Sequence, residues 1–364
     1  MRISLRPRKA DRVFATRAKP AKGYSFRRCI SGMVTRRKFV LSTAALAVGA
    51  SGCLGDGTAG GAEPSGGDDG GSGTGGDGTG PPTRELASPL HVSPEEFESA
   101  ATDVLQKDGI PSIDEPEFDD GENVDDDDPV FGVVMDGEAR AYPQDILAQH
   151  EIVNDTVGGK NVAVTYCPLT GTAIGYERGG TTFGVSGDLV NSNLIMYDRA
   201  TETRYPQILG VGTDGANEGR SLVEFDVTWT TWERWREEHP ESPVLSRDTG
   251  FVRNYNRDPY GGYNPKSGYY ENDRLTFSVM SRDERYHPKK VFMVARDANE
   301  AVAFDKDRLR EEGELSVETE NGEYTATYEE TLDTASIERD GEAITTFDAM
   351  WFAWSAFYPD THVK

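Results

Sequence analysis

A single cysteine at a tight turn is the residue of this chain best suited to chemistry. Cys167 opens a Cys-Pro-Leu-Thr-Gly connection that ends at Gly171, between strand-like runs at 162–166 and 172–176. Proline and glycine favour a turn over a strand or a helix at this point. A polarisable, oxidisable side chain is therefore expected where the backbone reverses, on the kind of loop that commonly carries function.

The sequence leaves three roles open for Cys167. In the first, Cys167, His150 and Met196 ligate a soft metal such as copper, because thiolate, imidazole and thioether are suitable donors. In the second, His150 activates Cys167 as the nucleophile of a cysteine-dependent enzyme, and Asn193 or Asp198 orients the histidine. In the third, Cys167 is a small buried apolar residue and His150 a hydrogen-bonded structural one. A small-molecule site that uses neither residue is a further alternative.

The N-terminal region resembles an export signal. Arg36-Arg37 followed by Phe39 is similar to a twin-arginine signal, and the apolar run 39–50 is too short to span a bilayer. The run ends in Ala50-Ser51-Gly52-Cys53, which resembles a lipobox. We therefore expect residues 33–53 to be a signal whose Cys53 carries lipid, and residues 1–32 to be a mispredicted leader before a true start at Met33.

Two of the three cysteines lie in this N-terminal region. Cys29 falls in the expected leader and Cys53 is the expected lipidation site, which leaves Cys167 alone in the remainder. No internal disulfide is expected, and a single remaining thiol in an exported protein is a feature to follow. The expected location is the outer face of the cytoplasmic membrane, with the membrane as a partner through the lipid on Cys53.

Charge separates the N-terminal region from the rest. Residues 1–52 hold 13 basic residues and one acidic residue, whereas residues 53–364 hold 25 basic and 62 acidic residues, a formal charge of −37. Such a surface repels phosphate backbones, which argues against nucleic acid as a partner. We interpret the acidity as adaptation to a salty medium. Residues 54–90 are rich in glycine and aspartate and are expected to be a disordered tether.

The globular domain is expected to cover residues 91–364. Ser93-Pro94-Glu95-Glu96 is a capping box that predicts a helix to about Lys107. Asp136-Gly137, Asn321-Gly322 and Asp340-Gly341 each lie between strand-like runs and predict hairpins. Trp232 and Trp235 should face the core from a helix capped by Thr230. Aromatic residues at helical spacing predict a helix over 346–358.

A weak internal duplication accompanies these hairpins. The run Val291–Val294 matches Val130–Val133, Glu300–Phe304 matches Glu138–Tyr142 after a one-residue insertion, and Leu309 matches Leu147. These matches indicate two related strand–turn–strand–helix units. Many hairpins and few helices predict an α+β fold: a predominantly antiparallel β, hairpin-rich single domain with a few short helices.

Several phrases of the sequence resemble the DUF3179 family of exported domains, whose biochemical function is unassigned. The resemblance runs from about Ile110 to Tyr358. The phrases are those at 137–143, 150–155, 166–169, 183–187, 192–199, 258–260 and 357–361. Family members often carry a second cysteine where this chain has Thr170, and a Leu-Pro-Pro-Lys phrase where it has Tyr286-His287-Pro288-Lys289.

The family resemblance supplies no mechanism. The two differences from the family pattern reduce the number of candidate site residues. Thr170 in place of a cysteine weakens a dithiol or two-cysteine metal site, and His287 is a poor candidate for a role shared by the family. The sequence therefore predicts a membrane-anchored extracytoplasmic lipoprotein domain that binds a metal or small ligand near Cys167. A cysteine-dependent enzyme is the alternative.

Overall fold

Residues 80–364 are described by a computed structural model of the chain. The expected leader, the export signal with Cys53, and residues 54–79 of the expected tether lie outside this range. Residues 80–90, also assigned to the tether, pack on the domain. Within them β1 (Thr83–Arg84) pairs with β12 (Ser221–Leu222), and the hydroxyl of the buried Ser88 lies 2.8 Å from Tyr358 Oη.

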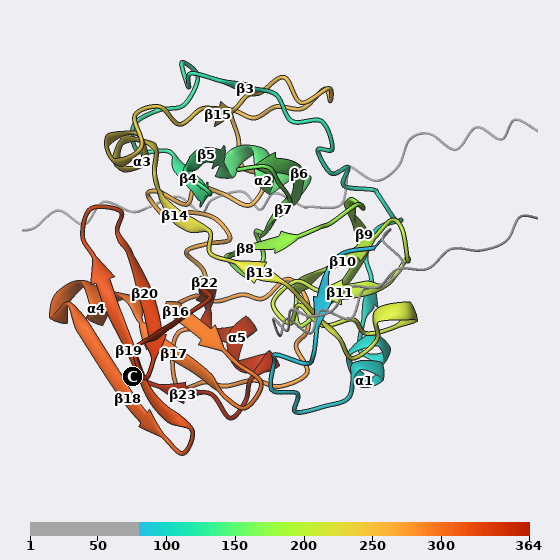
Figure 1. Cartoon of the computed structure of the whole chain (residues 1–364), viewed down its shortest axis with the longest axis vertical. Coiled ribbons are helices and arrows are strands. Elements are labelled where there is room, and N and C mark those ends of the chain that lie inside the picture. Colours follow the sequence, from blue (N-terminus) through green and yellow to red (C-terminus); the bar gives the residue numbers. More distant parts are fainter. Residues whose placement is uncertain (1–79) are drawn as a thin grey trace, which may run out of the picture. The chain divides into compact units, whose positions relative to one another are not determined.

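Antiparallel sheets dominate the architecture (Figure 1). The five-stranded sheet has the order β14 (Thr228–Thr231), β4 (Pro129–Met135), β5 (Glu138–Pro143), β15 (Val244–Leu245), β3 (Phe118–Asp119). A four-stranded sheet has the order β13 (Glu224–Phe225), β8 (Thr172–Glu177), β7 (Lys160–Cys167), β6 (Ile152–Val157). Another has the order β11 (Arg204–Pro206), β10 (Asn193–Asp198), β9 (Phe183–Val190), β2 (Thr102–Asp103).

The C-terminal third adds two four-stranded sheets, drawn in orange and red in Figure 1. One has the order β22 (Thr346–Met350), β16 (Val291–Arg296), β17 (Ala301–Asp305), β23 (His362–Val363). The other is a meander of β18 (Glu314–Thr319), β19 (Gly322–Glu329), β20 (Thr334–Arg339) and β21 (Glu342–Ile344). Two pairs among the described strands are parallel, β5 with β15 and β17 with β23.

Helices are few and short. They are α1 (Pro94–Ser99), α2 (Gln144–His150), α3 (Trp232–Glu238), α4 (Lys306–Glu312), α5 (Trp351–Phe357) and the 3₁₀ turn η1 (Gly215–Asn217). No helix within residues 80–364 is long and apolar enough to cross a membrane. This arrangement confirms the predicted hairpin-rich, mainly antiparallel α+β fold.

The predicted hairpins are present. The three dipeptides Asp136-Gly137, Asn321-Gly322 and Asp340-Gly341 turn β4 into β5, β18 into β19 and β20 into β21. Two strand–turn–strand–helix units also exist, β4-β5-α2 and β16-β17-α4. Leu147 and Leu309 are the fourth residue of their respective helices, and both are fully buried.

Two predicted helices are too long. The capping box at Ser93 and Glu96 is present, but α1 ends at Ser99, because the following residues pair as β2 with the edge of β9. The predicted helix over 346–358 begins as strand β22, which pairs with β16, and only α5 is helical. Thr231 rather than Thr230 is the N-terminal cap of α3. Its Trp232 and Trp235 are buried as predicted.

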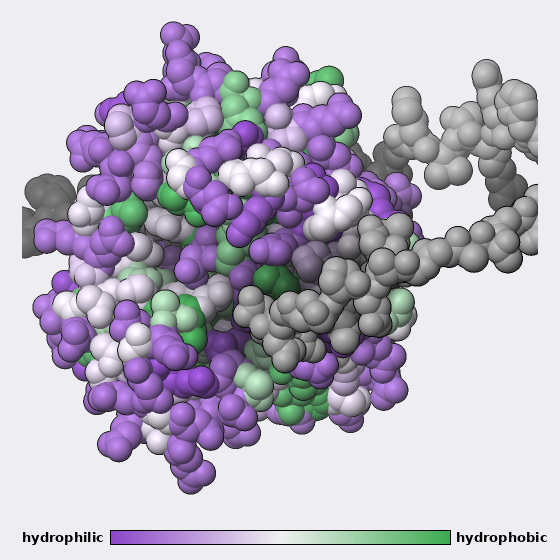
Figure 2. All heavy atoms as spheres, in the orientation of Figure 1, coloured by the Kyte–Doolittle hydropathy of each residue, from purple (hydrophilic) through white to green (hydrophobic). Residues whose placement is uncertain are grey.

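Polar side chains cover most of the visible face of the domain (Figure 2). Beneath this surface the largest apolar cluster joins β8, β9, β10, β16, β22 and α5, and it includes Cys167, Leu169, Leu194 and Met196. A second cluster lies under α2 and β4 to β7. The turn after Cys167 is therefore embedded in the core rather than displayed on a loop at the surface.

Candidate functional site

Cys167 ends β7, and the turn that follows leads directly into β8. The backbone reverses through Gly171 at φ +60°, and Cys167 pairs with Thr172 across the hairpin. The sulfur lies 3.4 Å from the backbone nitrogen of Leu194, which donates to it, and 3.8 Å from the carbonyl oxygen of Ser192. The thiol is thus fixed between the turn and the start of β10.

Burial controls the acidity of this thiol. Only 1% of Cys167 is exposed, and burial, followed by the nearby carboxyl of Glu151, raises the thiol pKa to about 11. The thiolate is the reactive and metal-binding form, so these surroundings disfavour both a nucleophile and a ligand. They are the surroundings that a packing role requires.

His150 uses both ring nitrogens away from Cys167. Nδ1 lies 2.7 Å from the carbonyl oxygen of Pro111, and Nε2 lies 2.6 Å from Tyr255 Oη. The ring also packs on Phe251, with centroids 5.2 Å apart. Burial lowers the pKa of His150, which favours the neutral imidazole. The geometry therefore gives His150 no hydrogen bond with which to activate Cys167.

The other nominated residues also have structural partners. Met196 is fully buried in β10, between Val185 of β9 and Tyr205 of β11. The carboxylate of Asp198 accepts hydrogen bonds from the backbone nitrogens of residues 200 and 201, at 3.1 and 2.7 Å, and so closes the turn after β10. Within residues 80–364 no group of three or more His, Cys, Asp or Glu side chains has the geometry of a metal site.

Asn193 belongs to a buried amide and hydroxyl network that the sequence did not reveal. Its Nδ2 donates to Thr170 Oγ1 at 3.1 Å and to Gln207 Oε1 at 3.0 Å, and its Oδ1 accepts from the backbone nitrogen of Ile208. Gln207 Oε1 also accepts from the hydroxyl of Thr172 at 2.6 Å. Because every member finds a partner, the network fixes the Cys167 turn against β10 and rigidifies this part of the core.

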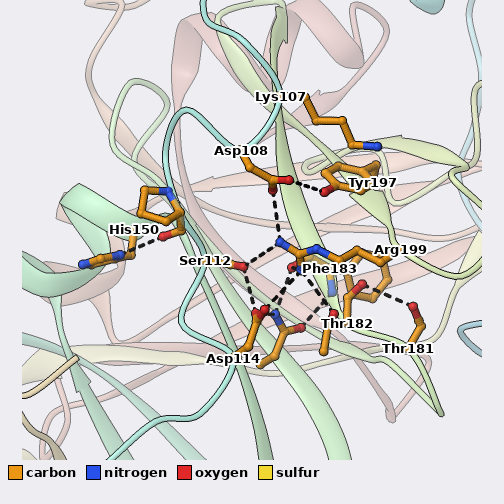
Figure 3. Close-up of polar contacts among 12 residues, drawn as sticks. Lys107, Asp108, Ser112, Asp114, His150, Thr181, Thr182, Phe183, Tyr197 and Arg199 are labelled. Carbon is orange, nitrogen blue, oxygen red and sulfur yellow. Dashed lines mark hydrogen bonds and ion pairs between the residues drawn. The ribbon is translucent and has the colours of Figure 1, made fainter. Parts of the chain in front are cut away.

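Arg199 is the centre of a second network, shown in Figure 3. Its guanidinium contacts Asp108, Ser112 and the carbonyl oxygen of Phe183 at 3.0, 3.1 and 2.9 Å. The close-up shows His150 well apart from Arg199, with its own hydrogen bond. Arg199 follows β10, and its contacts link Asp108 and Ser112, in the segment after β2, to Phe183 of β9. This role is structural.

A small apolar cavity lies beside the Cys167 turn. Its volume is about 230 Å³, and two acidic residues line it: Glu151, which follows α2, and Asp188, which is paired with Arg204. The remaining wall is mostly aliphatic and aromatic, and it includes Leu105, Ile110, Leu169, Val185, Leu189, Leu194, Tyr260 and Phe277. Gly187 has φ +91°, and a Cβ at this position would lie 2.1 Å from the carbonyl oxygen of Leu105, so only glycine fits here.

Glu151 is the unusual member of this cavity. Its residue is 5% exposed, has φ +61°, and its carboxyl has no hydrogen-bond partner among the described residues. A non-glycine residue at positive φ costs free energy, and so does a buried carboxylate without a partner. Burial raises the carboxyl pKa to about 8. At neutral pH Glu151 is therefore mainly protonated, and it can donate a hydrogen bond into the cavity.

Tyr260 forms the wall near Glu151. Its backbone nitrogen donates to Asp258 Oδ1 at 2.7 Å, and Asp258 is held in turn by Gln144 Nε2 and Tyr270 Oη at 2.8 and 2.7 Å. Burial, and then the nearby Glu151 carboxyl, raise the pKa of Tyr260. Since the phenol stays neutral, it is a second polar group available beside the carboxyl.

Comparison with known proteins identifies the family. Residues 107–342 match the family model described as a protein of unknown function, DUF3179. The chain belongs to the DUF3179 family. No curated protein and no solved structure gives a significant match to it.

The phrases that carry the DUF3179 resemblance converge on the Glu151 cavity. Five of them, distant in sequence, each contribute to its wall, through Glu151, Leu169, Val185 with Gly187, Leu194 and Tyr260. Within these phrases the sequence pattern pointed to His150 and Cys167, whereas Glu151 and Tyr260 were not predicted as site residues. The available signal was a glutamate placed between a helix and the apolar strand of β6, where a charged residue is unexpected.

Proposed function

We propose that this DUF3179 domain is a binding module that holds a small, neutral, mainly apolar molecule in the Glu151 cavity. The observation that carries the proposal is the carboxyl of the buried residue Glu151, which has no hydrogen-bond partner among the described residues and lines a mostly apolar cavity. Concave apolar sites with a few polar groups are typical of small-molecule binding. A carbonyl or ether oxygen on the ligand would accept a hydrogen bond from the neutral Glu151 carboxyl and so supply its missing partner.

The location of Cys167 supports a binding function over a cysteine-dependent enzyme. Its sulfur accepts a hydrogen bond from the backbone nitrogen of Leu194, a residue that lines the cavity, and Leu169 of the same turn lines it too. The thiol therefore lies behind the cavity wall and shapes it by packing. A nucleophile would need exposure and a favoured thiolate, and Cys167 has neither.

The ligand class can be tested with six-carbon probes followed by NMR of the folded protein. 2-Hexanone carries the expected acceptor, and hexane lacks it. We expect wild type to prefer 2-hexanone, and Glu151→Leu to lose about fivefold or more of the 2-hexanone affinity while keeping that for hexane. Glu320→Leu, which changes an exposed glutamate, is the matched control and should bind as wild type does.

The pH dependence of 2-hexanone binding sharpens this test. Wild type should lose affinity as pH rises through about 8, because the ionised Glu151 carboxylate no longer donates. Glu151→Gln keeps a permanent donor and should bind at all pH values. Equal affinity of wild type and Glu151→Leu for 2-hexanone, or no saturable shift at cavity residues, would contradict the proposal.

We further propose that the binding module is displayed outside the cell as a lipoprotein anchored through Cys53. The support is the twin-arginine pattern at Arg36-Arg37, the lipobox that ends at Cys53, and the acidity of the remaining chain, which suits a salty medium. Fractionation of cells that express Cys53→Ser tests the anchor. Release of the protein from membranes is the expected result, and continued retention would contradict it.

A further inference from the structure

A second cavity, here called the Lys306 cavity, differs in character from the Glu151 cavity. It has a volume of about 310 Å³ and lies among β14, the 263–266 segment, β16, α4 and β22. Its charged lining residues are the cations Lys266, Lys290, Lys306 and Arg310 and the acids Asp307, Asp333 and Asp348. The four cations outnumber the three acids by one, whereas the whole chain has a formal charge of −25.

Most of these charges are already paired. Lys306 Nζ lies 2.8 Å from Asp348 Oδ2, with both side chains buried, and Arg310 holds Asp333 through two hydrogen bonds of 2.7 and 2.9 Å. Lys290 Nζ lies 2.7 Å from Asp305 Oδ2. These pairs fix the walls of the cavity and leave little of their charge for a ligand.

Lys266 is the exception among the cations. It forms no ion pair with any residue that the structure describes, and its Nζ stands 5.5 Å from the ring centroid of Tyr263. Lys266 is an exposed residue, so its ammonium group, which lines the cavity and has no carboxylate partner, attracts an anion through an interaction that solvent and salt screen in part.

Two buried oxygen atoms in the same cavity also lack a partner. Asp348 Oδ1 and Thr230 Oγ1 make no hydrogen bond to any described residue, although both residues are only 5% exposed. A buried polar atom without a partner costs about 1–3 kcal/mol, so an occupant that supplies the hydrogen bonds would be favoured. Asp348 Oδ1 can only accept, which requires a donor such as a hydroxyl group on the occupant.

From these three groups we infer that the Lys306 cavity binds a small organic anion that also carries hydroxyl groups, such as a phosphorylated polyol. The anionic end lies toward Lys266, and a hydroxyl donates to Asp348 Oδ1 while another contacts Thr230 Oγ1. A bare anion would meet the unpaired carboxylate oxygen of Asp348, and a neutral polyol would leave Lys266 unused. This site is separate from the Glu151 cavity and does not rest on its function.

Calorimetric titration of the folded protein with sn-glycerol 3-phosphate tests the inference. Inorganic phosphate and glycerol, tested alone, separate the contributions of the anion and of the hydroxyl groups. We expect sn-glycerol 3-phosphate to bind at least about tenfold more tightly than either. Binding should weaken as salt is added, because salt screens the ammonium of Lys266.

Three variants complete the test. Lys266→Gln should weaken sn-glycerol 3-phosphate binding about tenfold, and Thr230→Val, which keeps the side-chain shape, about threefold. Lys160→Gln removes an exposed lysine elsewhere and should leave binding unchanged. The inference is overturned if sn-glycerol 3-phosphate gives no saturable binding, if phosphate alone binds equally well, or if Lys266→Gln and Lys160→Gln behave alike.

Discussion

The two strand–turn–strand–helix units end their helices in different ways. Each helix has seven residues and a buried leucine at its fourth position, and each is followed by a residue at positive φ whose backbone nitrogen donates to that leucine's carbonyl oxygen. After α4 that residue is Gly313, at φ +82°, and a Cβ there would touch nothing. After α2 it is Glu151, buried in the cavity.

This difference shows what is particular to the first unit. Glycine adopts positive φ at no steric cost and is the common residue after a helix. A glutamate at the same place has an unfavourable backbone conformation and a desolvated carboxyl. Strained and desolvated groups of this kind concentrate at functional sites. Glu151 therefore makes the first unit less stable while it places a carboxyl in the lining of a cavity, whereas Gly313 carries no such cost in the second unit.

The largest expected effect comes from making the first unit end like the second. Glu151→Gly should raise the free energy of unfolding by roughly 4 kcal/mol near pH 7.5, mainly because it removes the carboxyl whose pKa burial raises from 4.5 to about 8, and also because glycine relieves the backbone strain. Near pH 3.5 the carboxyl is mainly protonated in both states, so only the backbone part of the gain, about 1 kcal/mol, should remain. Urea unfolding at the two pH values measures it. A variant that is less stable than wild type at pH 7.5 would contradict the conclusion that Glu151 is unfavourable at the end of α2.

The hairpins were predictable from the sequence, because residues within each turn determine the turn's conformation. The Asp136-Gly137, Asn321-Gly322 and Asp340-Gly341 turns define their hairpins through residues that accept positive φ, and all three were found from the sequence. The predicted helices extended too far, over residues 100–107 and 346–350. Their side-chain spacing is helical, but β9 and β16 offer backbone hydrogen bonds that a local pattern cannot reveal.

The candidate site was predictable only in part. The turn after Cys167 was located correctly, but the burial of its thiol depends on β10 and α5, which are distant in sequence. Glu151 was missed because a glutamate usually remains solvated, and its burial here arises from segments near residues 105, 169, 194, 260 and 277. The networks of Gln207 and Arg199 were missed for the same reason.

A smaller effect is expected when the second unit is given a side chain. Gly313→Ala should lower the free energy of unfolding by about 1 kcal/mol, because the added Cβ meets no atom and only the positive φ is unfavourable. The size of this loss calibrates the conformational part of the Glu151 strain. Urea unfolding near pH 7 provides the measurement. An unchanged stability would mean that positive φ costs little at this helix end, and that desolvation alone makes Glu151 unfavourable.

The central claim is that Glu151 keeps its proton inside the folded protein. Its pKa rises from an ordinary value of 4.5 to about 8, so between these values the native state holds a proton that the unfolded state has released. Stability must therefore fall as pH rises through this window, by roughly 1.4 kcal/mol per pH unit, and become level above it. Glu151→Gln lacks this proton and lacks this contribution.

The most direct measurement is the free energy of unfolding of wild type and Glu151→Gln from about pH 5 to pH 7.5 at fixed salt. The difference between the two proteins isolates Glu151 from other titrating groups, such as Asp145, whose pKa burial raises to about 6. We predict that wild type loses roughly 3 kcal/mol relative to the variant across this range. Parallel profiles for the two proteins would show that Glu151 is ionised in the folded state, and they would contradict the account.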